Sequence, residues 1–124
     1  MDAARERGLL IGVAATTMAT GALQAVRPQT TLAPLRAQDT PTTRHFFGTV
    51  GMFMVCTGGV LLHSLLRGRG DPDVVLWTAA QKLGAAAAVG IGAREQVFSP
   101  ASLGVAGFDA LSGALALDYW RRVR

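Results

Sequence analysis

The chain has 124 residues and a formal net charge of +4; 50% of its residues are hydrophobic and only 16% are charged. A soluble domain carries about 25% charged residues, and the mean hydropathy of +0.33 is also on the apolar side. The single cysteine excludes a disulfide scaffold, and the length and composition exclude a disordered chain and a multidomain enzyme. What remains is a small helical membrane protein or an unusually apolar soluble bundle.

Charged residues are concentrated between four apolar windows. The windows 9–26 and 46–66 contain no charged residue, and the windows 74–93 and 101–117 contain one each, Lys82 and Asp109. Each window has about the length of a helix that crosses a hydrocarbon core of about 30 Å. A soluble four-helix bundle would instead distribute charges along the outward face of each helix. We therefore predict an all-α fold, an antiparallel up-down bundle of four transmembrane helices at about 8–26, 46–66, 74–93 and 101–120.

Helix-ending signals separate these windows within one membrane domain, residues 1–124. Asp71-Pro72-Asp73 supplies a capping carboxylate before the third window, and Ser99-Pro100 supplies a serine cap before the fourth. The stretch 27–45, rich in proline and threonine, is too polar to remain in lipid and is predicted as an outer loop.

The distribution of arginine predicts the orientation of the bundle. With the amino terminus inside, seven arginines lie on the inner side and four on the outer side, so the positive-inside rule predicts that both termini are cytoplasmic. The abundance of Ala, Gly and Arg is typical of a GC-rich bacterial genome, which predicts a multi-pass protein of the bacterial inner (plasma) membrane. An alternative is that the first window is a cleaved signal peptide, but its apolar run is longer than such a peptide needs.

Lys82 and Asp109 are the candidate functional pair. Each lies eight residues into its window, about 12 Å deep from opposite sides, so the two residues are expected at similar depths on neighbouring helices. An unpaired charge at the bilayer centre costs about 2.5–3.5 kcal/mol, and pairing lowers this cost. The pair is interpreted as a structural ion pair, or as a proton-relay or substrate-polarising pair; a third alternative is that each residue faces another partner.

Polar and small residues follow one face of the first two windows. Gly8, Gly12, Thr16, Thr20 and Gln24 recur at a spacing of four. Close helix packing through small residues is the ordinary explanation. The more specific hypothesis is that a polar stripe lines a cavity with the Lys82–Asp109 pair at its floor. Its candidate lining residues are Gln81, Gln24, Thr16, Thr20, Ser112 and His63.

No cofactor, metal site or firm catalytic residue is predicted. His45 and His63 are about 27 Å apart on a helix and cannot share a metal ion. Cys56 has no evident base to activate it as a nucleophile. The basic charge lies in loops and tails without the aromatic partners of a nucleic-acid surface, so no nucleic acid is expected as a partner.

The whole chain resembles the small, largely uncharacterised four-helix integral membrane proteins grouped as DoxX-like. The resemblance rests on length, span count and glycine placement. It is carried by Arg27-Pro28, Arg44 to Gly48 before a glycine-rich helix, Gln81-Lys82 and Gly107-Phe108-Asp109. It implies an association with redox or electron transport, which no cysteine pair in this chain supports.

The sequence leads to two functional hypotheses. The first is a non-catalytic accessory or structural protein whose partners are the lipid bilayer and either a second copy or another membrane subunit. The alternative is a compact membrane enzyme or proton-coupled carrier that uses Lys82 and Asp109 on a small or lipophilic substrate. A cavity that reaches the pair favours the alternative, and a pair sealed by packing favours the first hypothesis.

Overall fold

A computed structural model describes residues 1–124 as five helices. The predicted all-helical fold is confirmed. The four long helices form two pairs, α1 with α3 and α4 with α5, and the pairs meet through contacts of α1 with α5 and of α3 with α4. The helices are α1 (Ala3–Val26), α2 (Pro28–Leu35), α3 (Pro41–Leu66), α4 (Pro72–Arg94) and α5 (Ser102–Val123).

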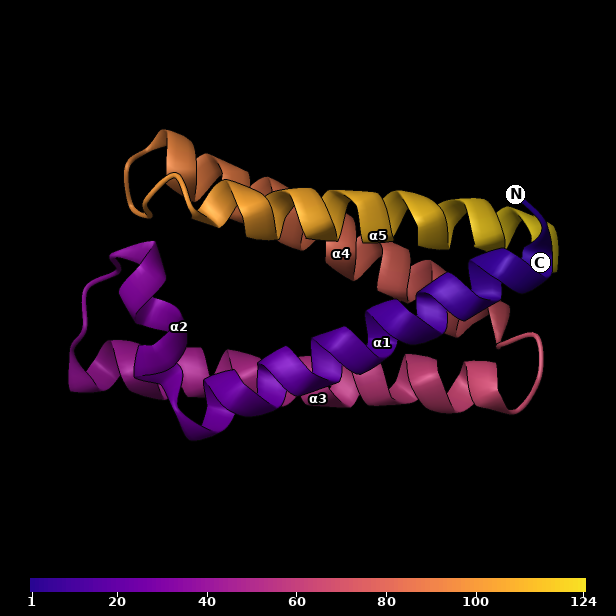
Figure 1. Ribbon diagram of the computed structural model, residues 1–124, viewed down its shortest axis with the longest axis horizontal. Helices are drawn as coiled ribbons and strands as arrows, with labels where there is room; N and C mark the ends of the chain where they lie inside the picture. The colour runs from indigo at the N-terminus through magenta and orange to yellow at the C-terminus, as the bar shows by residue number, and fades with distance from the viewer.

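Both termini lie at one end of the molecule, which we call the terminal end, together with the connection between α3 and α4 (Figure 1). The short helix α2 and the connection between α4 and α5 lie at the opposite end, where the two helix pairs are farther apart (Figure 1). The arrangement therefore has a closely packed half and a more open half.

Three helices, α1, α3 and α4, are long and apolar enough to cross a membrane. Helix α5 is not among them, because Asp109 and Asp118 lower the hydropathy of its 22 residues. Only 21 of the 124 residues are buried, and large apolar side chains such as Trp77 and Leu111 point outward. A soluble bundle would turn such side chains toward its core, so this surface is suited to lipid.

The stretch 27–45 differs from the predicted outer loop because it contains α2 and the first turn of α3. Proline is favoured at the first position of a helix, where its missing N–H has no partner to lose. Pro28 and Pro41 therefore begin helices. The prediction of a loop treated proline only as a residue that ends helices. Leu32 is buried and anchors α2 against the rest of the chain.

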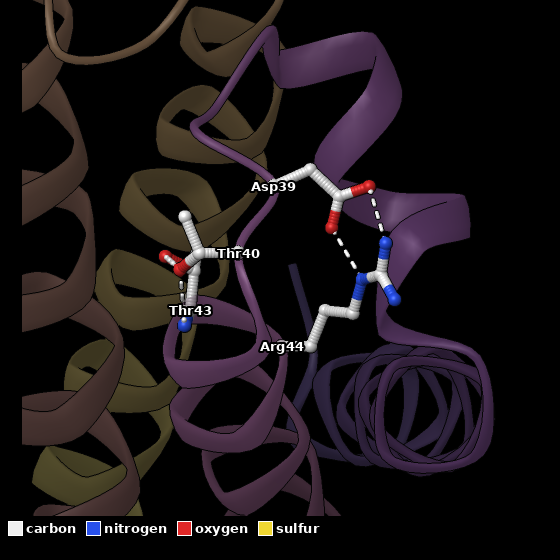
Figure 2. Close-up of polar contacts among 4 residues, drawn as sticks. All are labelled: Asp39, Thr40, Thr43 and Arg44. Atoms are coloured by element: carbon white, nitrogen blue, oxygen red, sulfur yellow. Dashed lines mark hydrogen bonds and ion pairs between the residues drawn. The ribbon is translucent and has the colours of Figure 1, made fainter.

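The start of α3 is fixed by side chains of the preceding turn (Figure 2). The Thr40 hydroxyl accepts a hydrogen bond from the Thr43 backbone N–H at 3.1 Å and caps the helix. Arg44 donates two hydrogen bonds to the Asp39 carboxylate, at 2.5 and 3.1 Å. These bonds from Arg44 hold the pKa of Asp39 below its ordinary value. The turn between α2 and α3 is therefore defined by local polar contacts.

Glycine allows α1 and α3 to pack closely. A Cβ atom at Gly21 would lie 2.7 Å from the Gly51 carbonyl oxygen, and one at Gly58 would lie 3.0 Å from the Ala14 carbonyl oxygen. Gly8 and Gly12 have no such neighbour, although the spacing of four placed them in the predicted packing stripe. The contact instead uses Gly21, which lies outside that stripe.

Two polar contacts tie α5 to other elements at the terminal end. The Tyr119 hydroxyl donates a hydrogen bond to the Arg69 carbonyl oxygen at 2.6 Å. Glu6 is 1% exposed, and its carboxylate lies 3.1 Å from the Arg122 guanidinium. Glu6 is thus part of the packed interior.

Arg7 links α1 to the end of α3. Its guanidinium donates hydrogen bonds to the carbonyl oxygens of Leu65, at 2.6 Å, and Gly68, at 2.7 Å. Hydrogen bonds from a charged group contribute about 1.5–3 kcal/mol. We expect Arg7→Ala to lower the free energy of unfolding in mixed micelles by about this amount. The exposed Arg5→Ala is the matched control, and equal stabilities of the two variants would contradict the assigned role.

Candidate functional site

Lys82 and Asp109 form a buried ion pair between α4 and α5. Lys82 Nζ donates a hydrogen bond to Asp109 Oδ1 at 2.9 Å, and the residues are 4% and 8% exposed. Gly113 permits this close approach, because a Cβ atom there would lie 2.7 Å from Leu83 Cγ. The two charges left inside the apolar windows therefore meet.

The surroundings of the pair leave hydrogen-bonding capacity unused. Lys82 Nζ also lies 5.2 Å from the centre of the Phe108 ring, a cation–π contact. Asp109 Oδ2 accepts no hydrogen bond from the protein. An ammonium group has three N–H donors and a carboxylate accepts at both oxygens, so each partner retains a place for a further polar group.

A cavity of about 520 Å³ reaches this pair from the open half of the molecule. It lies between the two helix pairs, and Lys82 and Asp109 are the only charged residues among those that line it. Its polar lining also includes Thr16, Thr20, Gln24 and Gln81, while its apolar lining includes Leu23, Leu35, Val50, Val105 and Phe108. Gln24 is held in place because its amide donates a hydrogen bond to the Phe47 carbonyl oxygen at 2.9 Å. The cavity thus combines apolar walls with one polar region.

Helix α2, at the end of the molecule opposite the termini (Figure 1), contributes Thr31 and Leu35 to the lining of this cavity. Ser99 joins α2 to the connection before α5, because its hydroxyl donates to the Pro34 carbonyl oxygen and its N–H to the Leu35 carbonyl oxygen, each at 2.8 Å. Leu35 and the neighbouring Phe98 both line the cavity. The two helix pairs are therefore bridged at the open half by a short helix rather than by a flexible loop.

A layer of buried side chains, which we call the apolar layer, separates the cavity from the terminal end. In each long helix, the members of this layer lie nearer to that end than the cavity-lining residues do. They are Leu10, Ala14, Leu61, Leu65, Val75, Ala79, Ala116 and Tyr119. The cavity is consequently closed toward the terminal end.

A second, much smaller void of about 10 Å³ lies on the other side of Lys82. Its lining includes Gln81 and Thr17, and the Thr17 hydroxyl is buried without a hydrogen-bond partner. A void needs about 10–15 Å³ to contain one water molecule, so this space matches a single water beside three polar side chains.

The structure brings together six of the eight residues singled out from the sequence. Lys82, Asp109, Gln81, Gln24, Thr16 and Thr20 all line the larger cavity. Ser112 is buried outside it, and His63 lines a shallow surface depression of about 1000 Å³ along α3 and the 67–71 connection. No group of three His, Cys, Asp or Glu side chains could bind a metal ion.

Sequence reasoning missed the part of the lining that comes from α2 and the α4–α5 connection, namely Thr31, Leu35 and Phe98. No local signal identified them, because both segments were expected to lie outside the bilayer as connections. Against known proteins, no family model, curated protein or solved structure matches this chain.

Proposed function

We propose that this chain is a multi-pass protein of the bacterial inner membrane, in which α5 is a fourth span and both termini are cytoplasmic. Helix α5 runs beside α4 with nearly the same length, 22 against 23 residues. Leu103 and Leu111 are exposed along α5, as lipid-facing residues would be. The seven arginines in the termini and the 67–71 connection, against four elsewhere, support a cytoplasmic location of these segments by the positive-inside rule.

We further propose that the protein binds a small lipophilic molecule in the cavity, with the polar group of that molecule at Lys82 and Asp109. The observation that supports this function is a cavity of about 520 Å³ that ends on a buried ion pair. Ligand sites typically have volumes of about 300–1,000 Å³ and apolar walls with a few polar groups. Ionisable residues within a membrane segment are, by default, evidence for a function.

The same geometry makes a purely structural pair the weaker explanation. A pair that only fixes helix order is best served by complete packing, whereas here open volume reaches both residues. Binding is also favoured over catalysis and transport. The lining contains no Ser, Cys or His, and its Lys and Asp are already joined to each other by a hydrogen bond, so no activated nucleophile is formed there. The apolar layer closes the route to the terminal end.

The proposal is tested by photolabelling the full chain in phosphatidylcholine nanodiscs with a medium-chain fatty alcohol that carries a diazirine. We expect labels on cavity residues, with severalfold less labelling in Ala85→Phe, whose new ring would occupy the cavity. Ala85 lines the cavity, whereas Ala87 is exposed and lies outside it, so Ala87→Phe is the matched control. Labels confined to lipid-facing residues, or equal cavity labelling in both variants, would contradict the proposed site.

A further inference from the structure

The charge balance of the cavity indicates the class of ligand. Resting on the proposed function, we infer that the cavity selects an amphiphile with an uncharged polar head that both donates and accepts hydrogen bonds, such as an alcohol or a primary amide. A carboxylate or an ammonium on the same hydrocarbon chain is rejected.

The ion pair leaves the cavity without a net charge. Lys82 and Asp109 neutralise each other at 2.9 Å, and the lining contains no third charged residue. A charged head would therefore leave the site with a net charge in surroundings of low dielectric. An uncompensated buried charge is strongly destabilising, so the pair disfavours anions and cations alike.

The unused hydrogen-bonding groups of the pair suit a head that both donates and accepts hydrogen bonds. Lys82 Nζ uses one of its three N–H donors on Asp109 Oδ1, and Asp109 Oδ2 accepts none from the protein. A hydroxyl group can accept from Nζ and donate to Oδ2 at the same time. Gln81, adjacent to Lys82 on the cavity wall, offers an amide with both capacities. The hydrocarbon part then lies along Leu23, Val50 and Val105.

The inference is tested with three diazirine probes that share one hydrocarbon chain and differ only in the head: an alcohol, a carboxylic acid and a primary amine. The full chain is photolabelled at neutral pH in phosphatidylcholine nanodiscs. Labelling of cavity residues is divided by labelling of lipid-facing residues of the same sample, which corrects for the partitioning of each probe. We expect this ratio to be about tenfold higher for the alcohol than for either charged probe, corresponding to about 1.4 kcal/mol.

Changing one partner of the pair should change the preferred head in a defined direction. Asp109→Asn leaves Lys82 unpaired and is expected to favour the acid, whereas Lys82→Gln leaves Asp109 unpaired and is expected to favour the amine. The double variant removes both charges and should still favour the alcohol. If a single variant fails to fold, the labelling ratios of the three probes in the unmodified protein are sufficient to test the preference for an uncharged head.

The outcomes separate this inference from the proposed function. If none of the three probes labels the cavity, the proposed function itself fails. If the cavity is labelled but the three ratios are equal, or a charged probe has the highest ratio, binding stands and the inferred preference for an uncharged head is overturned.

Discussion

Gly51→Ala is expected to separate α1 from α3 and to lower the free energy of unfolding by about 3 kcal/mol, the upper end of the usual range for overpacking. A Cβ atom at Gly51 would lie 2.5 Å from the Gly21 carbonyl oxygen and 2.7 Å from the Ala25 nitrogen. Both atoms belong to the backbone of α1, so no side-chain rotation can relieve the overlap. The new methyl group can be accommodated only if the two helices move apart.

Gly59→Ala provides the matched control in the same helix. A Cβ atom there meets only the flexible end of Met18, at 3.8 Å. Alanine is favoured over glycine in a helix by about 0.8–1.0 kcal/mol, so this variant should be at least as stable as the unmodified protein. Unfolding by SDS in mixed micelles, followed by circular dichroism, measures both variants. Equal stability of Gly51→Ala and Gly59→Ala would show that close α1–α3 packing does not support the fold.

Removing one member of the ion pair is expected to cost about 3–5 kcal/mol, because the remaining charge stays buried without a partner. Lys82→Gln and Asp109→Asn each have this effect, since both residues are at least nine-tenths buried. The double variant leaves no unpaired charge at this site, so its stability should return to within about 1–2 kcal/mol of the unmodified protein. The double-mutant cycle thus gives a large coupling energy between the two positions.

The exposed pair of Asp118 and Arg122 supplies the control for this cycle. The side chains are 52% and 44% exposed, and exposed ion pairs contribute about 0.2–1 kcal/mol. Asp118→Asn should therefore have a small effect, measured under the same unfolding conditions. Additive losses in the Lys82–Asp109 double variant would contradict the coupling. A charge-exchanged variant, Lys82→Asp with Asp109→Lys, that restores both assembly and ligand binding would instead favour a structural pair.

The long helices and the ion pair could be predicted from the sequence, because apolar windows and the depth of a residue along a helix depend only on spacing. Lys82 and Asp109 meet as that depth arithmetic predicts. Helix α2 could not be predicted, because a proline at the position of Pro28 can either end one helix or begin the next. The resemblance to DoxX-like proteins, the bacterial membrane and the orientation stay predictions.

The lining of the cavity was only partly predictable, because the rotation of each helix about its axis is set by tertiary packing. Thr16, Thr20 and Gln24 share one face, which turns toward the cavity. Ser112 lies three residues from Asp109 yet is buried outside the lining, and His63 turns to the outer side of α3. Spacing therefore identified which residues share a face but not which neighbour that face meets.

The placement of both members of the Lys82–Asp109 pair in the α4–α5 hairpin has a consequence for biosynthesis. During synthesis, α1 and α3 emerge first and can pair with each other through their glycine contacts. The partner of Lys82 is Asp109, which belongs to the next helix along the chain and is synthesised soon after it. In the proposed arrangement, with α5 as a fourth span, insertion of each charge alone would cost about 2.5–3.5 kcal/mol, so release of the two helices into lipid as a neutralised pair avoids that cost. Under this proposal the protein assembles from two helix pairs, α1 with α3 and α4 with α5, and the second pair supplies both charged residues of the cavity.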